Sequence, residues 1–383
     1  MNIKQAIFAV LVAFFIFATS SDSVAVNTTD IDNVRDKGVL DDQDFKIIDD
    51  FLAQAVQELI RTRDFTSIAK LRTIILSRQS TQGQYAQQFS ESAHKHISAG
   101  FEQAQTLEPQ ERKIKVIINL LILIDGMEDL RLADLAIERL KNENAVICYW
   151  AVHCLTNPGI IKQLNSETMS NAILAQTIAE QFKELIESSG PEIIALMAKF
   201  AANVNIPQAE ELLLQIADMR IKRYAEWTVK YELLDIAILK LLNSKISLPS
   251  AAPNGLMPTT STGNPAVAQR FGQLYSYTIQ RYVIGNEILS DTQKQHLASV
   301  LVEVEDKCIS RLFGRPQTTI RRAIERNDLA ALIAEHNNLL GDETTPGQLP
   351  SKLGFDYGTT NNGSKRTAPS PLPNPPQKST VDN

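Results

Sequence analysis

The sequence predicts an all-α fold in which antiparallel helical hairpins stack side by side. Apolar side chains recur every three or four residues through residues 41–340, the spacing that places them on one face of an α-helix. The pattern falls into helix-length blocks, and two of them begin with a proline, Pro191 and Pro207, as expected at the first turn of a helix. The 383 residues are 44% apolar and 21% charged, so the chain can bury a core without a metal or disulfide cross-link.

Residues 1–25 have the pattern of an export signal peptide. Lys4 precedes an apolar stretch at 6–18, and small residues ending at Ala25 form a cleavage pattern. The apolar stretch is shorter than the roughly 20 residues that a membrane-spanning helix needs. We therefore expect cleavage and an exported mature chain, either periplasmic or secreted; the alternative is an uncleaved anchor. Residues 26–40 are polar and are expected to form a loose leader.

The helical domain is expected over residues 41–340, and its first helices are predicted at 41–61, 64–76, 84–105 and 111–125. Asp41 and Asp44 place negative charge at the start of the first helix, where the helix dipole favours it. The fourth helix is apolar nearly all round in its middle, so we expect it to be the most buried.

Two short amphipathic helices are predicted to fold back on each other over residues 130–158. The first has the sequence EDLRLADLAIERLK and the second AVICYWAVHCLT. Asn144 is suited to cap the second helix, and Pro158 ends it because proline disfavours helix in the preceding residue. Four apolar side chains share one face of the first helix: Leu130, Ala133, Ile137 and Leu140.

This hairpin resembles a HEAT or armadillo-type repeat, in which paired helices stack side by side. The resemblance is centred on residues 129–158. It implies an α-α superhelix, a HEAT/armadillo-like solenoid of antiparallel hairpins, and such arrays offer extended surfaces to partners. No strict repeat period is visible in the sequence, so any repeats are degenerate.

The later helices are predicted at 169–188, 191–203, 207–217, 222–242, 266–284, 290–313, 316–325 and 328–340. The spacing of Trp227 and Tyr231 places both on one face of the helix at 222–242. A Pro- and Ser/Thr-containing stretch at 243–265 is expected to be a long exposed loop. From residue 341 to 383 the composition shifts to Pro, Ser, Thr, Asn and Gly, which predicts a disordered tail.

The net charge argues against one class of partner, and the cysteine spacing argues against one disulfide. The net charge of −6 disfavours nucleic acid, whose sequence-independent binding depends on neutralising phosphates. Cys148 and Cys154 lie six residues apart on one predicted helix, about 9 Å along its axis, too far for a disulfide. Cys308 belongs to an apolar face and is expected in the core.

The sequence contains no recognisable catalytic, metal-binding or phosphate-binding motif, and we expect no cofactor and no metal site. Tyr149, Trp150 and His153 form one candidate binding site, because the two aromatic residues lie one turn before the histidine. The structural alternative is a histidine packed between helices. A second candidate comprises Arg315, Arg322 and Arg326, which could hold an anion at a helix N-terminus or could form a solvated basic face.

Two classes of function remain. The first is an exported, non-enzymatic α-helical scaffold or binding protein that presents a solenoid surface to a protein or an envelope polymer. The second is a ligand-binding or hydrolytic helical domain with a pocket near Trp150 and His153, which would need a carboxylate from another helix beside His153. We favour the scaffold, and not an enzyme, because no nucleophile–base pair can be identified.

Overall fold

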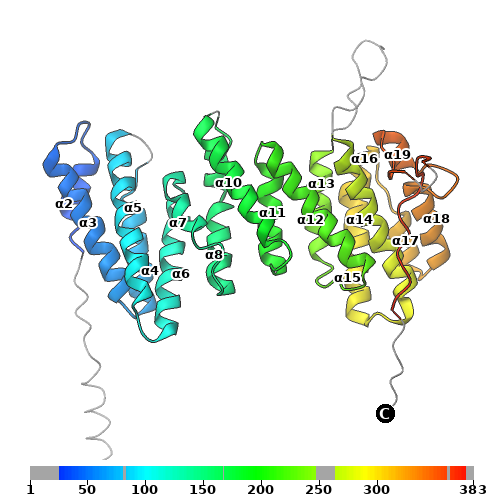
Figure 1. Cartoon of the computed structure of the whole chain (residues 1–383), viewed down its shortest axis with the longest axis horizontal. Coiled ribbons are helices and arrows are strands. Elements are labelled where there is room, and N and C mark those ends of the chain that lie inside the picture. The colour runs from blue at the N-terminus through cyan, green and yellow to red at the C-terminus, as the bar shows by residue number, and fades with distance from the viewer. Residues whose placement is uncertain (1–25, 81–82, 167, 247–263, 360–362, 377–383) are drawn as a thin grey trace, which may run out of the picture. The chain divides into compact units, whose positions relative to one another are not determined.

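The computed structural model describes residues 26–80, 83–166, 168–246, 264–359 and 363–376. The chain divides into two compact units, Met1–Asn157 and Pro158–Asn383. Within the described residues both units are built from helices joined by turns and loops, with isolated bridges but no β-strand (Figure 1). In this part of the chain no helix combines the length and the apolarity needed to cross a membrane.

Unit 1 consists of three packed helical hairpins preceded by a short helix. Consecutive helices pair as α3 with α4, α5 with α6 and α7 with α8. Contacts between alternate helices, α3 with α5 and α4 with α6 and then α8, define two layers. The elements are α2 (Thr29–Arg35), α3 (Asp42–Arg61), α4 (Phe65–Leu76), α5 (Gly83–Gln105), α6 (Gln110–Met127), η1 (Leu130–Leu132), α7 (Ala133–Ile137) and α8 (Ala145–Leu155).

Unit 2 repeats this two-layer packing. One layer contains α10, α12 and α14, and the other contains α11, α13 and α15. The elements are α9 (Pro158–Leu164), α10 (Met169–Leu185), α11 (Pro191–Asn203), α12 (Pro207–Ala225), α13 (Leu234–Lys245), α14 (Pro265–Ile284), η2 (Gly285–Glu287), α15 (Asp291–Val304), the π-helical η3 (Glu305–Ile309), α16 (Ser310–Phe313), α17 (Thr319–Glu325), α18 (Leu329–Leu340) and α19 (Gln348–Leu353).

Helix starts follow from the sequence. Asp41 and Asp44 form a capping box at α3, and the side chain of Asn144 accepts hydrogen bonds from the backbone at the start of α8. Proline occupies the first turn of α11, α12 and α14, where its missing N–H costs no hydrogen bond. The all-α, HEAT/armadillo-like fold class is confirmed, with the predicted central hairpin present as α7 and α8.

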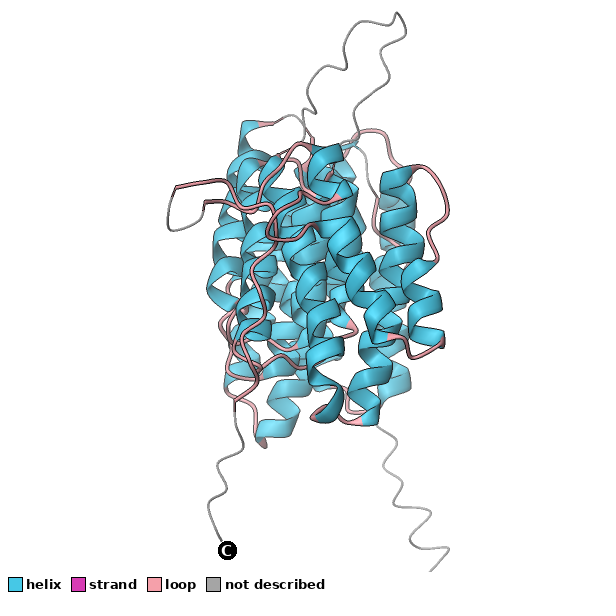
Figure 2. Cartoon of the chain, turned by 90° about the vertical axis from the view of Figure 1, so that its right-hand side faces the viewer, coloured by secondary structure: helices cyan, strands magenta, loops and turns pink. Residues whose placement is uncertain are grey.

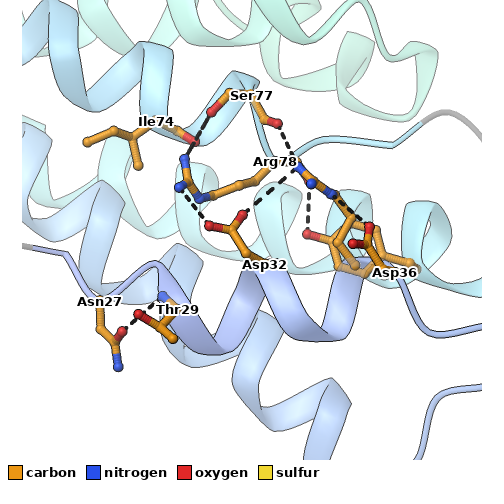
Figure 3. A network of polar contacts seen from close by, with 9 residues as sticks. Asn27, Thr29, Asp32, Asp36, Ile74, Ser77 and Arg78 are labelled. Carbon is orange, nitrogen blue, oxygen red and sulfur yellow. Dashed lines mark hydrogen bonds and ion pairs between the residues drawn. The ribbon is translucent and has the colours of Figure 1, made fainter.

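The expectation of a loose leader at 26–40 is wrong. The helix α2 buries Ile31 and Val34, which lie one turn apart, at 0% and 2% exposure. Polar contacts join α2 to the end of α4 (Figure 3). The Arg78 guanidinium donates to Asp32 at 3.0 Å, and that of Arg35 donates to the Ser77 carbonyl at 3.1 Å. The sequence did not predict this short amphipathic helix because its two apolar residues stand among polar neighbours.

The predicted helix at 222–242 is also wrong, because the chain turns between α12 and α13. Trp227 and Tyr231 have φ angles of 59° and 57°, so both adopt the left-handed conformation that side chains other than glycine rarely adopt. No glycine or proline marks this turn in the sequence. The two aromatic residues therefore do not share a helix face.

The structure corrects the extent of the disordered tail expected at 341–383. Residues 348–353 form α19, and Phe355, Tyr357 and Leu372 are buried. Figure 2 shows the following segment as a loop laid along the helices. Residues 377–383 lie outside the described residues, as do the expected signal at 1–25 and most of the expected loop, 247–263. The stretch from Asn243 to Lys245 belongs to α13.

A buried ion pair holds the α12–α13 turn together. Arg220 and Asp235 are 1% and 0% exposed and form two parallel hydrogen bonds of 2.7 and 2.9 Å. The Tyr224 hydroxyl donates to the same carboxylate at 2.7 Å, and Arg220 also donates to the Lys230 carbonyl at 3.0 Å. Each charge is thus satisfied inside the core, which is the condition for a buried pair to be tolerated.

We predict that Arg220→Met lowers the free energy of unfolding by about 3–5 kcal/mol, because it leaves the Asp235 carboxylate buried without its counter-ion. Urea unfolding followed by Trp227 fluorescence in a Trp150→Phe background measures this. Arg270→Met is the matched control: it removes a bidentate pair with Asp218 that is partly exposed, and should cost less than about 1 kcal/mol. Equal losses for the two variants would contradict the prediction.

Candidate functional site

The first predicted site lies in unit 1, where α6 and α8 bring His153 to Asp125. The Nδ1 atom of His153 is 3.0 Å from the Asp125 carboxylate, and the Asn157 amide donates to the same carboxylate at 3.0 Å. The His153 ring centroid lies 5.1 Å from that of Trp150 and 5.9 Å from that of Tyr149. The sequence identified the histidine but could not identify its carboxylate, which stands 28 residues earlier.

The thiols nearest to this histidine in sequence are unsuited to nucleophilic catalysis. Burial raises the pKa of the Cys154 thiol well above its ordinary value, and its Sγ lies 3.2 Å from the Leu121 carbonyl, to which it donates. Burial also raises the pKa of Cys148. Because the thiolate and not the thiol is the nucleophile, the His153–Asp125 pair has no activated thiol in either of these cysteines.

The second predicted site, in unit 2, places Arg315, Arg322 and Arg326 on the surface. The helix N-terminus beside them is already occupied. The carboxylate of Glu305, which is 1% exposed, accepts hydrogen bonds from the backbone N–H groups of Ile320 and Arg321 at 2.7 and 2.9 Å. An anion at this end of α17 would have to displace the chain's own carboxylate, so this part of the anion-binding interpretation is wrong.

Sequence reasoning missed a third site, at which α14 holds part of the C-terminal tail. The Gln273 amide accepts a hydrogen bond from the Ser370 N–H at 2.8 Å and donates to the Ser370 carbonyl at 3.2 Å. Two turns later, Gln280 accepts from the Leu372 N–H at 2.6 Å. Each glutamine thus pairs with the tail backbone much as a neighbouring β-strand would.

Trp227 completes this arrangement from the α12–α13 turn. Its indole N–H donates to the Pro373 carbonyl at 2.8 Å. The Arg281 guanidinium lies over the indole ring, 5.1 Å from its centroid, and fixes its orientation through a cation–π contact. We call Trp227, Gln273 and Gln280 the tail site, and residues 369–373 the tail segment.

The chain before the tail segment is fixed more firmly. Phe355 and Tyr357 pack over Gly272 of α14, where an added Cβ would come within 3.3 Å and 2.9 Å of their side chains. Two backbone hydrogen bonds join the chain on either side of residues 360–362: the Tyr357 N–H donates to the Arg366 carbonyl, and the Arg366 N–H donates to the Gly358 carbonyl. The tail segment is therefore delivered to α14 from an ordered base.

A cavity of about 610 Å³ lies beside the tail site, lined in part by Gln280, His336, Asp342 and Arg366. His336 contacts the Ser276 hydroxyl at 2.8 Å, and Gln280 donates to the same hydroxyl at 2.7 Å. Burial lowers the pKa of His336 below its ordinary value. The folded state around the tail site therefore favours the neutral form of His336 more than the unfolded chain does.

No protein-family model matches this sequence, and no curated protein matches it. Among solved structures, the chain is similar to Kap121p bound to Ste12p, with a TM-score of 0.38, 12% identity, and coverage of 81% of this chain and 33% of that chain. For Kap121p bound to Pho4p the TM-score is 0.37 at 12% identity, over 83% of this chain and 34% of that chain. The chain thus spans about a third of the length of these structures. Its fold is defined by the two-layer helix packing.

We predict that unit 2 loses stability as the pH falls from about 6.5 toward 5, because the unfolded chain binds a proton at His336 more readily than the folded chain does. Above that range the contribution of His336 is fully present. Urea unfolding of the native chain and of His336→Gln at several pH values tests this. His336→Gln should flatten the slope of stability against pH in this window. Identical slopes for the native chain and His336→Gln would refute the assignment.

Proposed function

We propose that this chain is an exported, non-enzymatic helical scaffold that binds another protein by holding an extended segment of it against α14. The observation that carries the proposal is the tail site, where three side chains pair with the backbone of a segment in extended conformation. Stacked helices expose side chains at regular intervals along one face, which suits them to hold an extended peptide. Export is supported by the signal pattern at residues 1–25.

A protein is favoured over an envelope polymer as the partner. The groups that Gln273 and Gln280 satisfy on the tail are peptide N–H and C=O groups. Their spacing along α14, seven residues apart, keeps both amides on one face of the helix. A polymer without a peptide backbone would not offer the same alternation of donor and acceptor.

The second candidate function is ligand binding or hydrolysis at His153. The 3.0 Å contact with Asp125 favours it, because a catalytic histidine needs a carboxylate to orient its ring. The buried thiols of Cys148 and Cys154 argue against it. Tyr149, Trp150 and His153 remain candidates for binding a ligand or a partner at this end of unit 1.

We predict that the full chain carrying Leu372→Asp captures a partner protein from an extract of its source cells. A charge at this buried tail position releases the tail from α14 and exposes the tail site. Affinity capture followed by mass spectrometry is the measurement. Adding Gln273→Ala and Gln280→Ala to the bait should abolish capture of that protein. Capture that is unaffected by the glutamine substitutions would place the binding surface elsewhere.

We also predict that the purified chain turns over none of a panel of hydrolase substrates. Any activity should persist in His153→Ala, since it would be a contaminant. Circular dichroism controls for folding of the variant, whose histidine contributes only a partly exposed contact. Turnover that disappears in a correctly folded His153→Ala would overturn the scaffold proposal in favour of the second candidate.

A further inference from the structure

We propose that the tail site recognises peptides of the form Pro-x-Pro-apolar-Pro, and that the chain's own segment Pro369-Ser370-Pro371-Leu372-Pro373 occupies it as an intramolecular competitor. The inference deepens the function proposed above, on which it rests, by naming the class of peptide and the means of regulation. The observation behind it is the set of hydrogen bonds that join the backbone of the tail segment to the three side chains of the tail site.

The tail site accepts hydrogen bonds from the backbone N–H groups of residues 370 and 372, and the prolines of the segment stand at other positions. Gln273 takes the N–H of Ser370 and Gln280 takes that of Leu372. The alternate residues, Pro371 and Pro373, have no N–H to donate. In an extended chain successive N–H groups point in opposite directions, so these positions would direct their N–H groups away from α14. Proline there leaves no donor unpaired.

Two residues of the segment are buried, and they lie three positions apart. Pro369 is buried and Leu372 is 4% exposed, whereas Pro371 and Pro373 are exposed. Pro369 and Leu372 are therefore the positions of the segment at which burial can select the side chain. Pro371 and Pro373 restrict the free peptide to extended conformations, so the peptide loses less conformational entropy on binding.

Trp227 binds the C-terminal residue of the tail segment. Its N–H donates to the carbonyl of Pro373, the last residue of the Pro-x-Pro-apolar-Pro unit. The residue is held at φ 59°, a left-handed conformation that side chains other than glycine rarely adopt. Such strain persists only where the surroundings enforce it, here the Arg281 stacking contact and the turn fixed by Arg220.

The tail segment can leave without dismantling the fold. Within the described residues, positions 369–373 make no backbone–backbone hydrogen bond, and the last such anchor is at Arg366. Their backbone groups bond to side chains of α14 and to Trp227, which a second peptide could use in the same way. The Ser370 hydroxyl also accepts a hydrogen bond from the Arg366 guanidinium at 2.9 Å, a contact that would be lost when the segment leaves. Occupancy by the tail therefore excludes a competing peptide and is reversible.

The test measures binding of a fluorescein-labelled peptide with the sequence TAPSPLPNPP, residues 367–376, to the full chain by fluorescence anisotropy. We expect the Kd to be at least tenfold lower for Leu372→Asp than for the native chain, because the released tail no longer competes. Asn374→Asp is the matched control: it adds the same charge at an exposed position two residues away and should behave as the native chain. Ser370→Pro, which removes the N–H taken by Gln273, gives a second means of release without adding charge.

Specificity is tested with altered peptides on the Leu372→Asp chain. A peptide carrying Leu372→Asp should not bind, and one with Pro371→Ala and Pro373→Ala should bind several-fold more weakly. Adding Gln273→Ala and Gln280→Ala to the chain should weaken binding of the original peptide at least tenfold. Equal affinity of the native and both released chains would overturn competition, and failure of both folded released chains to bind the peptide would overturn the whole inference. Peptide binding without capture of any protein would refute the proposed function alone, and capture without peptide binding would refute this inference and leave the proposed function standing.

Discussion

The buried pair of Arg220 and Asp235 is the constraint on which the part of unit 2 that holds the tail segment depends. One guanidinium satisfies a carboxylate from α13 and a backbone carbonyl of the turn, so it fixes where α12 ends and where α13 begins. Burial alone would lower the pKa of Arg220, but the charge of Asp235 outweighs it and the pKa is raised. The turn it stabilises carries Trp227, whose indole reaches the tail. A charge interaction in the core thereby sets the geometry of a hydrogen bond at the surface.

Much of the fold was predictable because the apolar period of a helix is a local property. The helix starts at Asp41, Asn144, Pro191 and Pro207 were predicted correctly, and Cys308 lies in the core as its apolar face predicted, at 0% exposure. Pro265, by contrast, was predicted to lie in the loop and instead begins α14. Helix ends were less predictable. The turn after Ala225 contains no glycine or proline, and its left-handed residues are held by tertiary contacts, among them the ion pair of Arg220 with Asp235 and the stacking of Arg281 on Trp227.

The functional residues were harder to predict because their meaning lies in their partners. Gln273 and Gln280 look like ordinary polar positions on an amphipathic helix, and a Pro-rich tail looks disordered whenever no surface is known to receive it. The seven-residue spacing of the two glutamines was visible in the sequence. Nothing in the sequence linked these glutamines to their partners in the tail, since Gln280 and Leu372 are 92 residues apart. His153 shows the same limit, since its chemistry depends on a carboxylate from another helix.

The covalent connection between the tail segment and α14 changes how strongly any partner must bind. A tethered segment meets its site at an effective concentration in the millimolar range when the linker is short and flexible. A segment whose affinity as a free peptide were only about 10 µM would then fill its site roughly 99% of the time. A competing protein must either be abundant or hold a second contact on the scaffold, and the two-layer helix array provides ample surface for one. A segment with low affinity as a free peptide can thus keep its site almost fully occupied when it is part of the same chain.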